Sequence, residues 1–157
     1  MDTHNHSPGH DVPLRKLAAS ATRHCLTGCV IGEVAGLLLG VSLGWQPLTT
    51  ALVATALAFA SGFALTLIPM TLKQGRSVAE TFRIVWLGET ISIGVMELAM
   101  NVIDYLLGGM SAKSVAEPVF WYSMAAAVVA GYLAGYPVNY LMLKHNIKGE
   151  CHQINSL

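Results

Sequence analysis

Charged residues are scarce in this sequence. Asp, Glu, Lys and Arg account for 11% of its 157 residues, whereas a soluble globular domain usually carries about 25%. Nine basic and nine acidic residues give a formal net charge of +0, so the chain lacks the basic surface of a nucleic-acid-binding protein. These two deficits argue against an ordinary soluble domain and against a nucleic-acid partner.

Two long segments, residues 34–72 and 118–143, contain no charged residue at all. A transmembrane helix needs about 20 mostly apolar residues, so the first segment is long enough for two helices and the second for one. The first is interrupted by Gly44, Trp45, Gln46 and Pro47, a turn sequence with a Trp typical of a membrane interface. We therefore expect a helical hairpin there.

A further apolar segment contains Glu89, Glu97 and Asp104 and provides a fourth candidate span. The predicted fold class is therefore an all-α integral membrane protein with four transmembrane helices. The expected spans are residues 22–43, 47–71, 84–107 and 118–143. Residues 1–21 are expected to form a flexible, His-containing tail, and residues 144–157 a second tail. Pro69 is expected to fray the second helix and Pro137 to kink the fourth.

The basic residues predict the orientation. Lys and Arg beside a span are retained on the cytoplasmic side, and eight of the nine flank one side of the expected bundle: Arg15, Lys16, Arg23, Lys73, Arg76, Arg83, Lys144 and Lys148. Only Lys113 lies on the other side, so both termini are expected in the cytoplasm, where disulfides are rare. Residues 1–11 do not resemble a signal peptide, so the first span is expected to stay in the membrane.

The first span carries two rows of residues at a spacing of four. One row consists of small residues, Gly28, Gly32, Gly36 and Gly40, which let another helix approach closely. The other contains Cys25, Cys29 and Glu33. A charged carboxylate near the bilayer centre is costly, so Glu33 is expected to face the bundle interior and to be paired or protonated.

The third and fourth spans are also patterned. In the third, two neighbouring rows are too polar to face lipid: Glu89, Ile93, Glu97 and Asn101, and Ser92, Met96, Met100 and Asp104. The first and third spans run in the same direction, which predicts a depth for Glu33 between Glu89 and Glu97. Because three ionised acids would repel strongly, at least one is expected to be protonated or to share a cation. In the fourth span Gly131 and Gly135 lead to Asn139.

Candidate metal ligands gather at the start of the first span. His24, Cys25 and Cys29 provide an imidazole and two thiols on neighbouring helix positions, a set that suits copper(I) or zinc(II). Met96 and Met100 would add thioethers, although Met also fills irregular gaps in cores and Cys can act as a small apolar residue. The tails could collect metal weakly through His4, His6, His10, His145, Cys151 and His152.

Signatures of several enzyme classes are missing. The sequence has no phosphate-binding glycine loop, no zinc-protease motif and no nucleophile elbow, which argues against a hydrolase. His24 is the only His in an expected span, which argues against a haem held between two histidines of one subunit. An enzymatic role is therefore less expected than binding or transport.

The strings HCLTGCVIGE at 24–33, ETISI at 89–93 and YPVN at 136–139 resemble an uncharacterised bacterial family of small integral membrane proteins, catalogued as a domain of unknown function. The resemblance covers about residues 22–143. Its motif positions in this sequence are His24, Cys25, Gly28, Cys29, Gly32, Glu33, Glu89, Ser92, Met96, Glu97, Asn101, Pro137 and Asn139. Members of the family are sometimes labelled alongside copper oxidases, so the resemblance implies a link to copper and a place in the bacterial inner membrane.

The leading expectation is a multi-pass protein of the lipid bilayer that captures a soft metal ion, copper(I) or zinc, and stores or transports it. His24, Cys25 and Cys29 form the expected cytoplasmic entrance, and the expected interior path consists of Glu33, Glu89, Met96, Glu97, Met100 and Asn101. Ser92, Asp104 and Asn139 are expected to line the path or to pack, and the glycine rows suggest a homo-oligomer. Two alternatives are a redox metalloprotein or metal-enzyme assembly factor, and a proton or cation channel with incidental cysteines.

Overall fold

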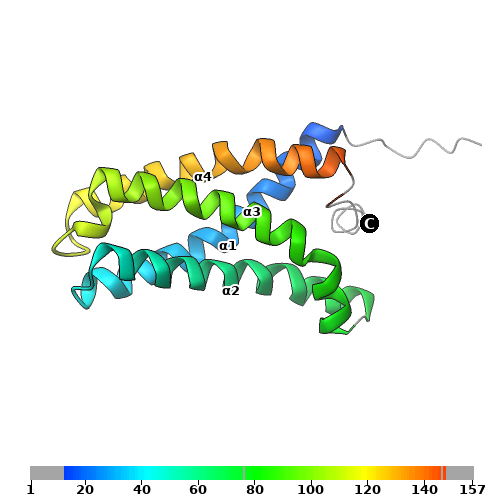
Figure 1. Ribbon diagram of the computed structural model, residues 1–157, viewed down its shortest axis with the longest axis horizontal. Helices are drawn as coiled ribbons and strands as arrows, with labels where there is room; N and C mark the ends of the chain where they lie inside the picture. The colour runs from blue at the N-terminus through cyan, green and yellow to red at the C-terminus, as the bar shows by residue number, and fades with distance from the viewer. Residues whose placement is uncertain (1–12, 76, 146, 148–157) are drawn as a thin grey trace, which may run out of the picture.

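The computed structural model is an up-and-down bundle of four long helices (Figure 1). It describes residues 13–75, 77–145 and 147, apart from the side chains of Lys73 and Gln74. The helices are α1 (Leu14–Ser42), α2 (Pro47–Gln74), α3 (Val78–Leu107) and α4 (Pro118–Lys144), with a short 3-10 turn η1 (Gly109–Ser111) before α4. The described residues contain no strand. An all-helical fold is therefore confirmed.

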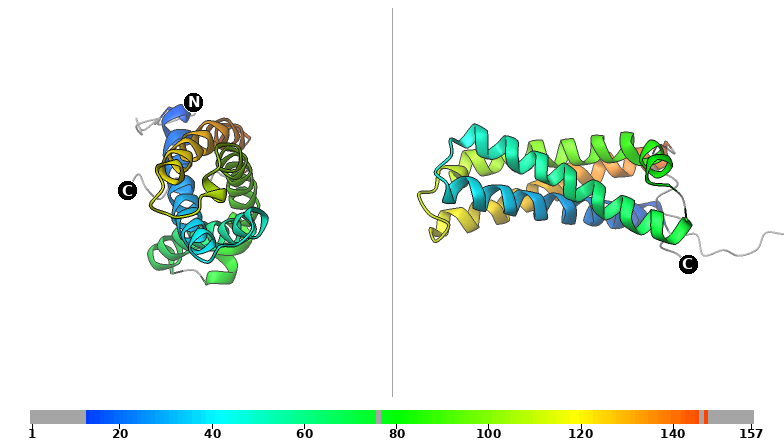
Figure 2. Two further views of the ribbon diagram at one scale, coloured as in Figure 1. Left: turned by 90° about the vertical axis from the view of Figure 1, so that its left-hand side faces the viewer. Right: turned by 90° about the horizontal axis from the view of Figure 1, so that it is seen from below.

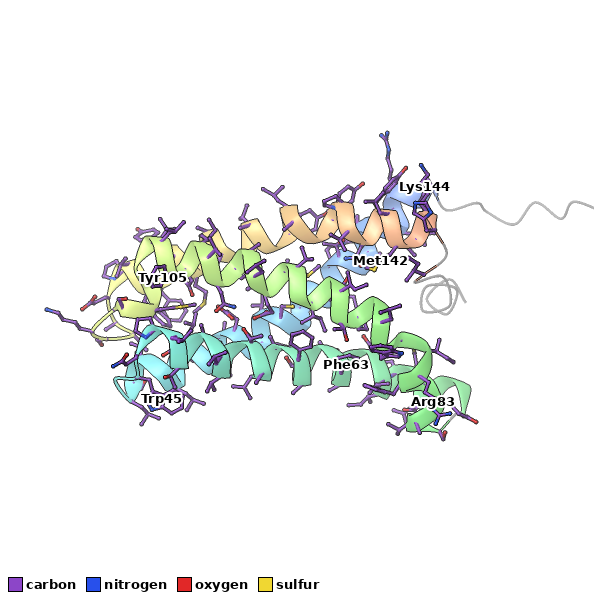
Figure 3. All side chains as sticks on the ribbon, viewed as in Figure 1. Trp45, Phe63, Arg83, Tyr105, Met142 and Lys144 are labelled. Carbon is purple, nitrogen blue, oxygen red and sulfur yellow. The ribbon has the colours of Figure 1, made fainter. Side chains whose placement is uncertain are left out.

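All four helices are long and apolar enough to cross a membrane. Seen from its end, the bundle places α1 and α3 at opposite corners, each beside both α2 and α4 (Figure 2). Arg83 and Lys144 lie at one end of the bundle and Trp45 and Tyr105 at the other (Figure 3). Arg83, Lys144 and the start of α1 thus share one end of the bundle.

The predicted hairpin between the first two helices is confirmed. Gly44 has a φ of 66°, a left-handed conformation that glycine adopts without strain. The Trp45 amide donates to the carbonyl of Gly40 at 2.8 Å, and Pro47 occupies the first position of α2. Pro fits there because its missing N–H would have no helical partner.

Two helices begin earlier than the sequence analysis predicted. α1 starts at Leu14 rather than 22, so residues 14–21 of the expected tail are helical. α3 starts at Val78 rather than 84 because Ser77 and Glu80 form a capping box, in which each side chain accepts a hydrogen bond from the other's backbone N–H at 3.3 Å. This motif satisfies N–H groups that a helix start leaves without partners.

The two internal prolines do not end their helices. α2 continues through Pro69 to Gln74, and α4 continues through Pro137 to Lys144, so the expected fraying at Pro69 is wrong. Beyond Pro69, the Thr71 hydroxyl donates to the carbonyls of Leu67 and Ile68 at 2.9 and 3.0 Å.

The glycine row of α1 packs against α2. A Cβ added at Gly28, Gly32 or Gly36 would collide with the backbone of Gly62, Ala58 or Ala54, so the two backbones touch without intervening side chains. A Ser61 hydroxyl reinforces the contact by donating to the Gly28 carbonyl at 2.6 Å. A Cβ added at Gly40 would collide with the side chain of Thr50. Because this row is used within one chain, it provides no evidence for the predicted homo-oligomer.

The helices α3 and α4 pack differently. Met100 occupies the space left by Gly131, and Met96 occupies the space left by Gly135. Both methionine side chains are completely buried. They therefore serve as packing groups between α3 and α4, which is the structural role that the sequence analysis weighed against metal binding.

Candidate functional site

The candidate site is a line of buried polar side chains between α1 and α3, which we call the interior column. Three of its members come from α1 and three from α3: Cys25, Cys29 and Glu33, and Glu89, Glu97 and Asp104. None is more than 2% exposed. The column exists because the glycine row fixes one face of α1 on α2, which turns the neighbouring row toward α3.

At the end of the column nearest the chain termini, a thiol meets a carboxyl group. Cys25 Sγ donates to Glu89 Oε2 at 3.3 Å. One turn further along α1, Cys29 is close enough to Glu97 and Cys25 to interact electrostatically. Neither cysteine forms a disulfide bond within the described part of the chain. Two thiols therefore lie between the acids Glu89 and Glu97.

Glu33 lies deeper, within electrostatic range of Glu97 and Asp104. The predicted depth of Glu33 between Glu89 and Glu97 stays a prediction. Measured from Leu14 and Val78, Glu33 and Glu97 are the same number of residues into their helices.

Most carboxylate oxygens of the three deeper acids lack a hydrogen-bond donor in the chain as described, although Asn101 Nδ2 donates to Glu97 Oε2 at 3.5 Å. Among the residues that the structure describes, no donor reaches either carboxylate oxygen of Glu33 or of Asp104, nor Glu97 Oε1. Two carboxylates that face each other in a low-dielectric interior cannot both stay ionised unless a cation lies between them. The arrangement therefore suits the binding of protons or of a cation.

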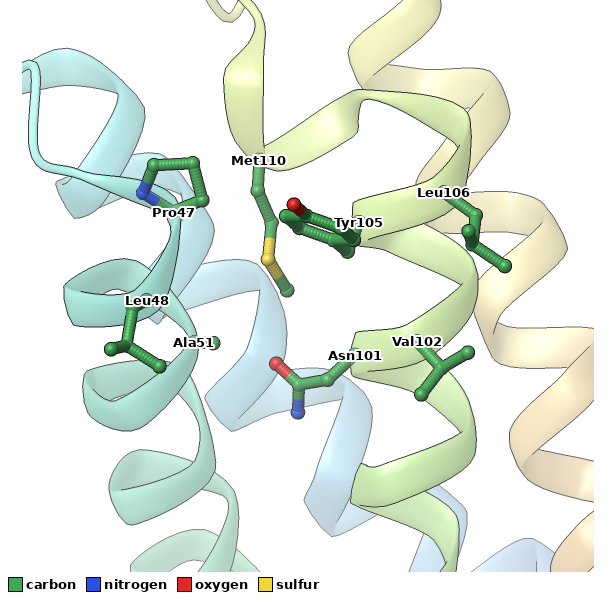
Figure 4. Close-up of a pocket in the computed structure, with 8 residues that line it drawn as sticks. All are labelled: Pro47, Leu48, Ala51, Asn101, Val102, Tyr105, Leu106 and Met110. Atoms are coloured by element: carbon green, nitrogen blue, oxygen red, sulfur yellow. The ribbon is translucent and has the colours of Figure 1, made fainter.

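Asn101 connects the column to the side of the bundle. Its Nδ2 donates to the Glu97 carbonyl at 2.8 Å and to Thr55 Oγ1 of α2 at 3.1 Å. The same residue lines a cavity of about 460 Å³ between α2 and α3, whose other walls are mostly apolar (Figure 4). Asn101 thus holds Glu97 in place and lies between the acids and this lateral cavity.

A second polar network joins three helices beside the column. Ser92 Oγ donates to Asn139 Oδ1 at 2.6 Å, and Asn139 Nδ2 donates to Thr22 Oγ1 at 3.2 Å. Thr22 in turn donates to the Ala18 carbonyl at 2.8 Å. Neutral partners satisfy these groups, so Ser92 and Asn139 fit the predicted packing role.

The predicted metal entrance does not form around three ligands. His24 is exposed, whereas Cys25 and Cys29 are buried, because consecutive positions on a helix point in different directions. Within the described part of the chain, no three His, Cys, Asp or Glu side chains are arranged to hold a metal ion. The tail ligands His4, His6, His10, Cys151 and His152 lie outside the described residues.

The sequence analysis missed three polar residues that surround the acids. Thr55 contacts Asn101, and Thr22 contacts Asn139. Ser123 lies against Asp104, where a Cβ on Gly109 would collide with both side chains. Single hydroxyl groups in apolar helices are common and produce no periodic pattern, so only the packing of neighbouring helices reveals them.

Comparison with known proteins places the chain in a family without an assigned function. Residues 15–148 match the family described as Domain of unknown function (DUF4396), and the chain belongs to this family. The predicted membership of an uncharacterised domain family is therefore confirmed, while the association with copper stays a prediction. No curated protein matches the chain, and no solved structure does.

Proposed function

We propose that this member of the family is a membrane-spanning carrier that moves a cation through the interior column in exchange for protons. Glu33, Glu97 and Asp104 hold the protons when the cation is absent and release them when it binds. The protein lies in a bacterial inner membrane with both termini on the cytoplasmic side, so Cys25 and Glu89 are at the cytoplasmic end of the column.

The observation that carries this proposal is the environment of Glu33. Its side chain is 0% exposed, neither oxygen has a hydrogen-bond donor among the described residues, and its neighbours are two further acids. A purely structural carboxylate would be expected to have donors, because an unsatisfied buried polar group is costly. Polar and ionisable residues inside a membrane typically mark ion or proton pathways.

The two thiols favour a soft metal ion as the transported cation. Thiolates select copper(I) and zinc over magnesium and calcium, and copper(I) forms stable complexes with two thiolates. The ion would be passed from Cys25 and Cys29 to the acids, with Glu89 accepting the Cys25 thiol proton along their hydrogen bond. In this proposal the metal is the transported substrate.

The test is ion flux in sealed proteoliposomes that contain a fluorescent pH indicator and a copper(I) indicator. Wild-type protein should couple copper(I) movement to opposite proton movement. Glu33→Gln should reduce both fluxes about tenfold or more. The loss of a membrane-buried ionisable group should cost more than ~1.4 kcal/mol of free energy, which corresponds to a factor of ten. Glu117→Gln changes an acid outside the column at the start of α4 and should leave both fluxes unchanged.

Normal coupled flux in Glu33→Gln would contradict the proposal. Since a buried substitution can impair folding, Glu97→Gln provides a second variant, and both variants should elute from size exclusion as wild type does. If both fold normally and transport normally, the acids are packing groups.

A second candidate function is a proton or cation pathway in which the cysteines are incidental. It is favoured because His24 is exposed whereas the two cysteines are buried, and because the described residues contain no group of three His, Cys, Asp or Glu side chains that could hold a metal ion. The double variant Cys25→Ser, Cys29→Ser separates the two functions. Loss of copper(I) flux supports the soft-metal carrier, whereas proton flux that needs neither copper nor thiols supports the second candidate.

A further inference from the structure

A second cavity lies between the start of α1 and the end of α4, away from the interior column. It measures about 580 Å³ and is lined by Arg15, Tyr136, Pro137, Tyr140 and Leu141. These two helix ends lie side by side at the end of the bundle where Lys144 is found (Figures 1 and 3). Below the cavity, Leu14, Leu17 and the two tyrosines pack on a small core of Ala18, Ala21 and Leu143.

The cavity changes in polarity with depth. Arg15 is in the first turn of α1 and Tyr140 in the last turn but one of α4, so both lie near the end of the bundle. Pro137, about one turn deeper, and Leu141 are exposed on the outer surface. A positive, hydrogen-bonding rim thus continues into an apolar wall that faces outward.

The surrounding charge is positive. Lys16 and Lys144 flank the same helix ends and are exposed. α4 contains no acidic residue, and the first acid in α1 is the buried Glu33. An anion is therefore attracted to this rim without repulsion from an acid on either helix.

We propose that this cavity binds an anionic glycerophospholipid. The Arg15 guanidinium, whose planar donors match phosphate, binds the lipid phosphate, and the Tyr140 hydroxyl donates to the same headgroup. An acyl chain lies along Tyr136 and Pro137. Basic pockets at the cytoplasmic ends of transmembrane helices recognise anionic headgroups in this way, and tyrosine is enriched at that depth.

This inference rests on the part of the proposed function that places the chain in a membrane, but not on the acids or on transport. Its test is lipid binding to detergent-purified protein, measured by native mass spectrometry during titration with phosphatidylglycerol or phosphatidylcholine. Wild-type protein should bind phosphatidylglycerol in preference. Arg15→Gln should weaken that binding about tenfold, the loss of one charge-assisted hydrogen bond.

Lys16→Gln is the matched control, because it removes a neighbouring positive charge that does not line the cavity. It should change the affinity by less than about twofold if the site is local, since diffuse attraction between exposed charges is screened by salt. Equal losses in the two variants would overturn the proposal. Tyr140→Phe keeps the ring and should show a smaller loss, which guards against misfolding of the Arg15 variant.

Inorganic phosphate distinguishes the source of the anion. If millimolar phosphate alone displaces the bound lipid, the site recognises a free anion and the lipid assignment is wrong. Recovery of wild-type protein in the membrane fraction of cells tests the premise separately, so a failure of membrane insertion is not mistaken for a failure of lipid binding.

Discussion

Asn139 and Glu33 are both completely buried, yet their surroundings differ in kind. Asn139 accepts a hydrogen bond from Ser92 and donates one to Thr22, so neutral partners from two other helices bind its amide. Glu33 faces the acids Glu97 and Asp104. A satisfied neutral network stabilises one arrangement of helices, whereas clustered acids change their interactions whenever a proton or cation arrives. We therefore assign the first group to stability and the second to function.

Replacing Asn139 by Leu should lower stability without abolishing transport. The change removes hydrogen bonds to Ser92 and Thr22, and interhelical hydrogen bonds in membrane proteins average about 0.6 kcal/mol each, so we expect a loss of about 1–2 kcal/mol. Denaturant unfolding in detergent micelles measures it. Loss of ion flux in a variant of unchanged stability would instead place Asn139 in the ion path.

At the scale of helices, α1 organises the bundle because its two faces meet different neighbours. Its glycine face contacts the backbone of α2 directly, and its adjacent face contributes Cys25, Cys29 and Glu33 to the column. The close approach leaves α1 little freedom to rotate. The position of the acids therefore depends on the absence of side chains at residues such as Gly32.

Substituting Gly32 by Ala should destabilise the bundle by about 1–3 kcal/mol, the usual cost of inserting a methyl group where packed atoms cannot move away. The added Cβ would collide with the backbone of Leu57 and Ala58. Gly94→Ala is the control, since a Cβ there would meet only Phe59 Cζ at 3.9 Å, and Ala favours a helix over Gly. Thermal unfolding in detergent compares the two variants, and equal stabilities would disprove tight α1–α2 contact.

Sequence patterns predicted the helices better than their ends. Long uncharged segments and the Gly44 turn predicted three of the four helices, and an apolar segment with three acids predicted the other, because apolar length is sufficient evidence for a candidate span. The start of α3 was missed even though Ser77 and Glu80 carry the spacing of a capping box, because the apolar segment begins later. At the start of α1 no capping side chain is present, so the sequence offered little signal.

For the whole molecule, the rows of the first and third helices were each predicted to be too polar to face lipid, but whether they face each other could not be predicted from the sequence. The direction of individual side chains also required the packed structure. It turns Met96 and Met100 toward the α4 glycines, with both in one buried cluster with Cys25 and Cys29, and it leaves His24 exposed.

In the proposed function, the acids in the middle of the whole bundle carry protons that a cation replaces. Carboxyl groups from α1 and α3 meet there, and neither oxygen of Glu33 has a hydrogen-bond donor among the described residues. Neutralisation by protons stabilises the protein without cargo, and the cation takes over that role when it binds. Exchange of one for the other is then the elementary step of transport.

Infrared difference spectroscopy of the purified protein, before and after addition of copper(I), tests this claim most directly. The stretching band of a protonated carboxyl group should decrease when the ion binds, and the change should be reduced in Glu33→Gln but retained in Glu117→Gln. A spectrum in which copper(I) binds at the thiols and no protonated carboxyl band changes would contradict the account.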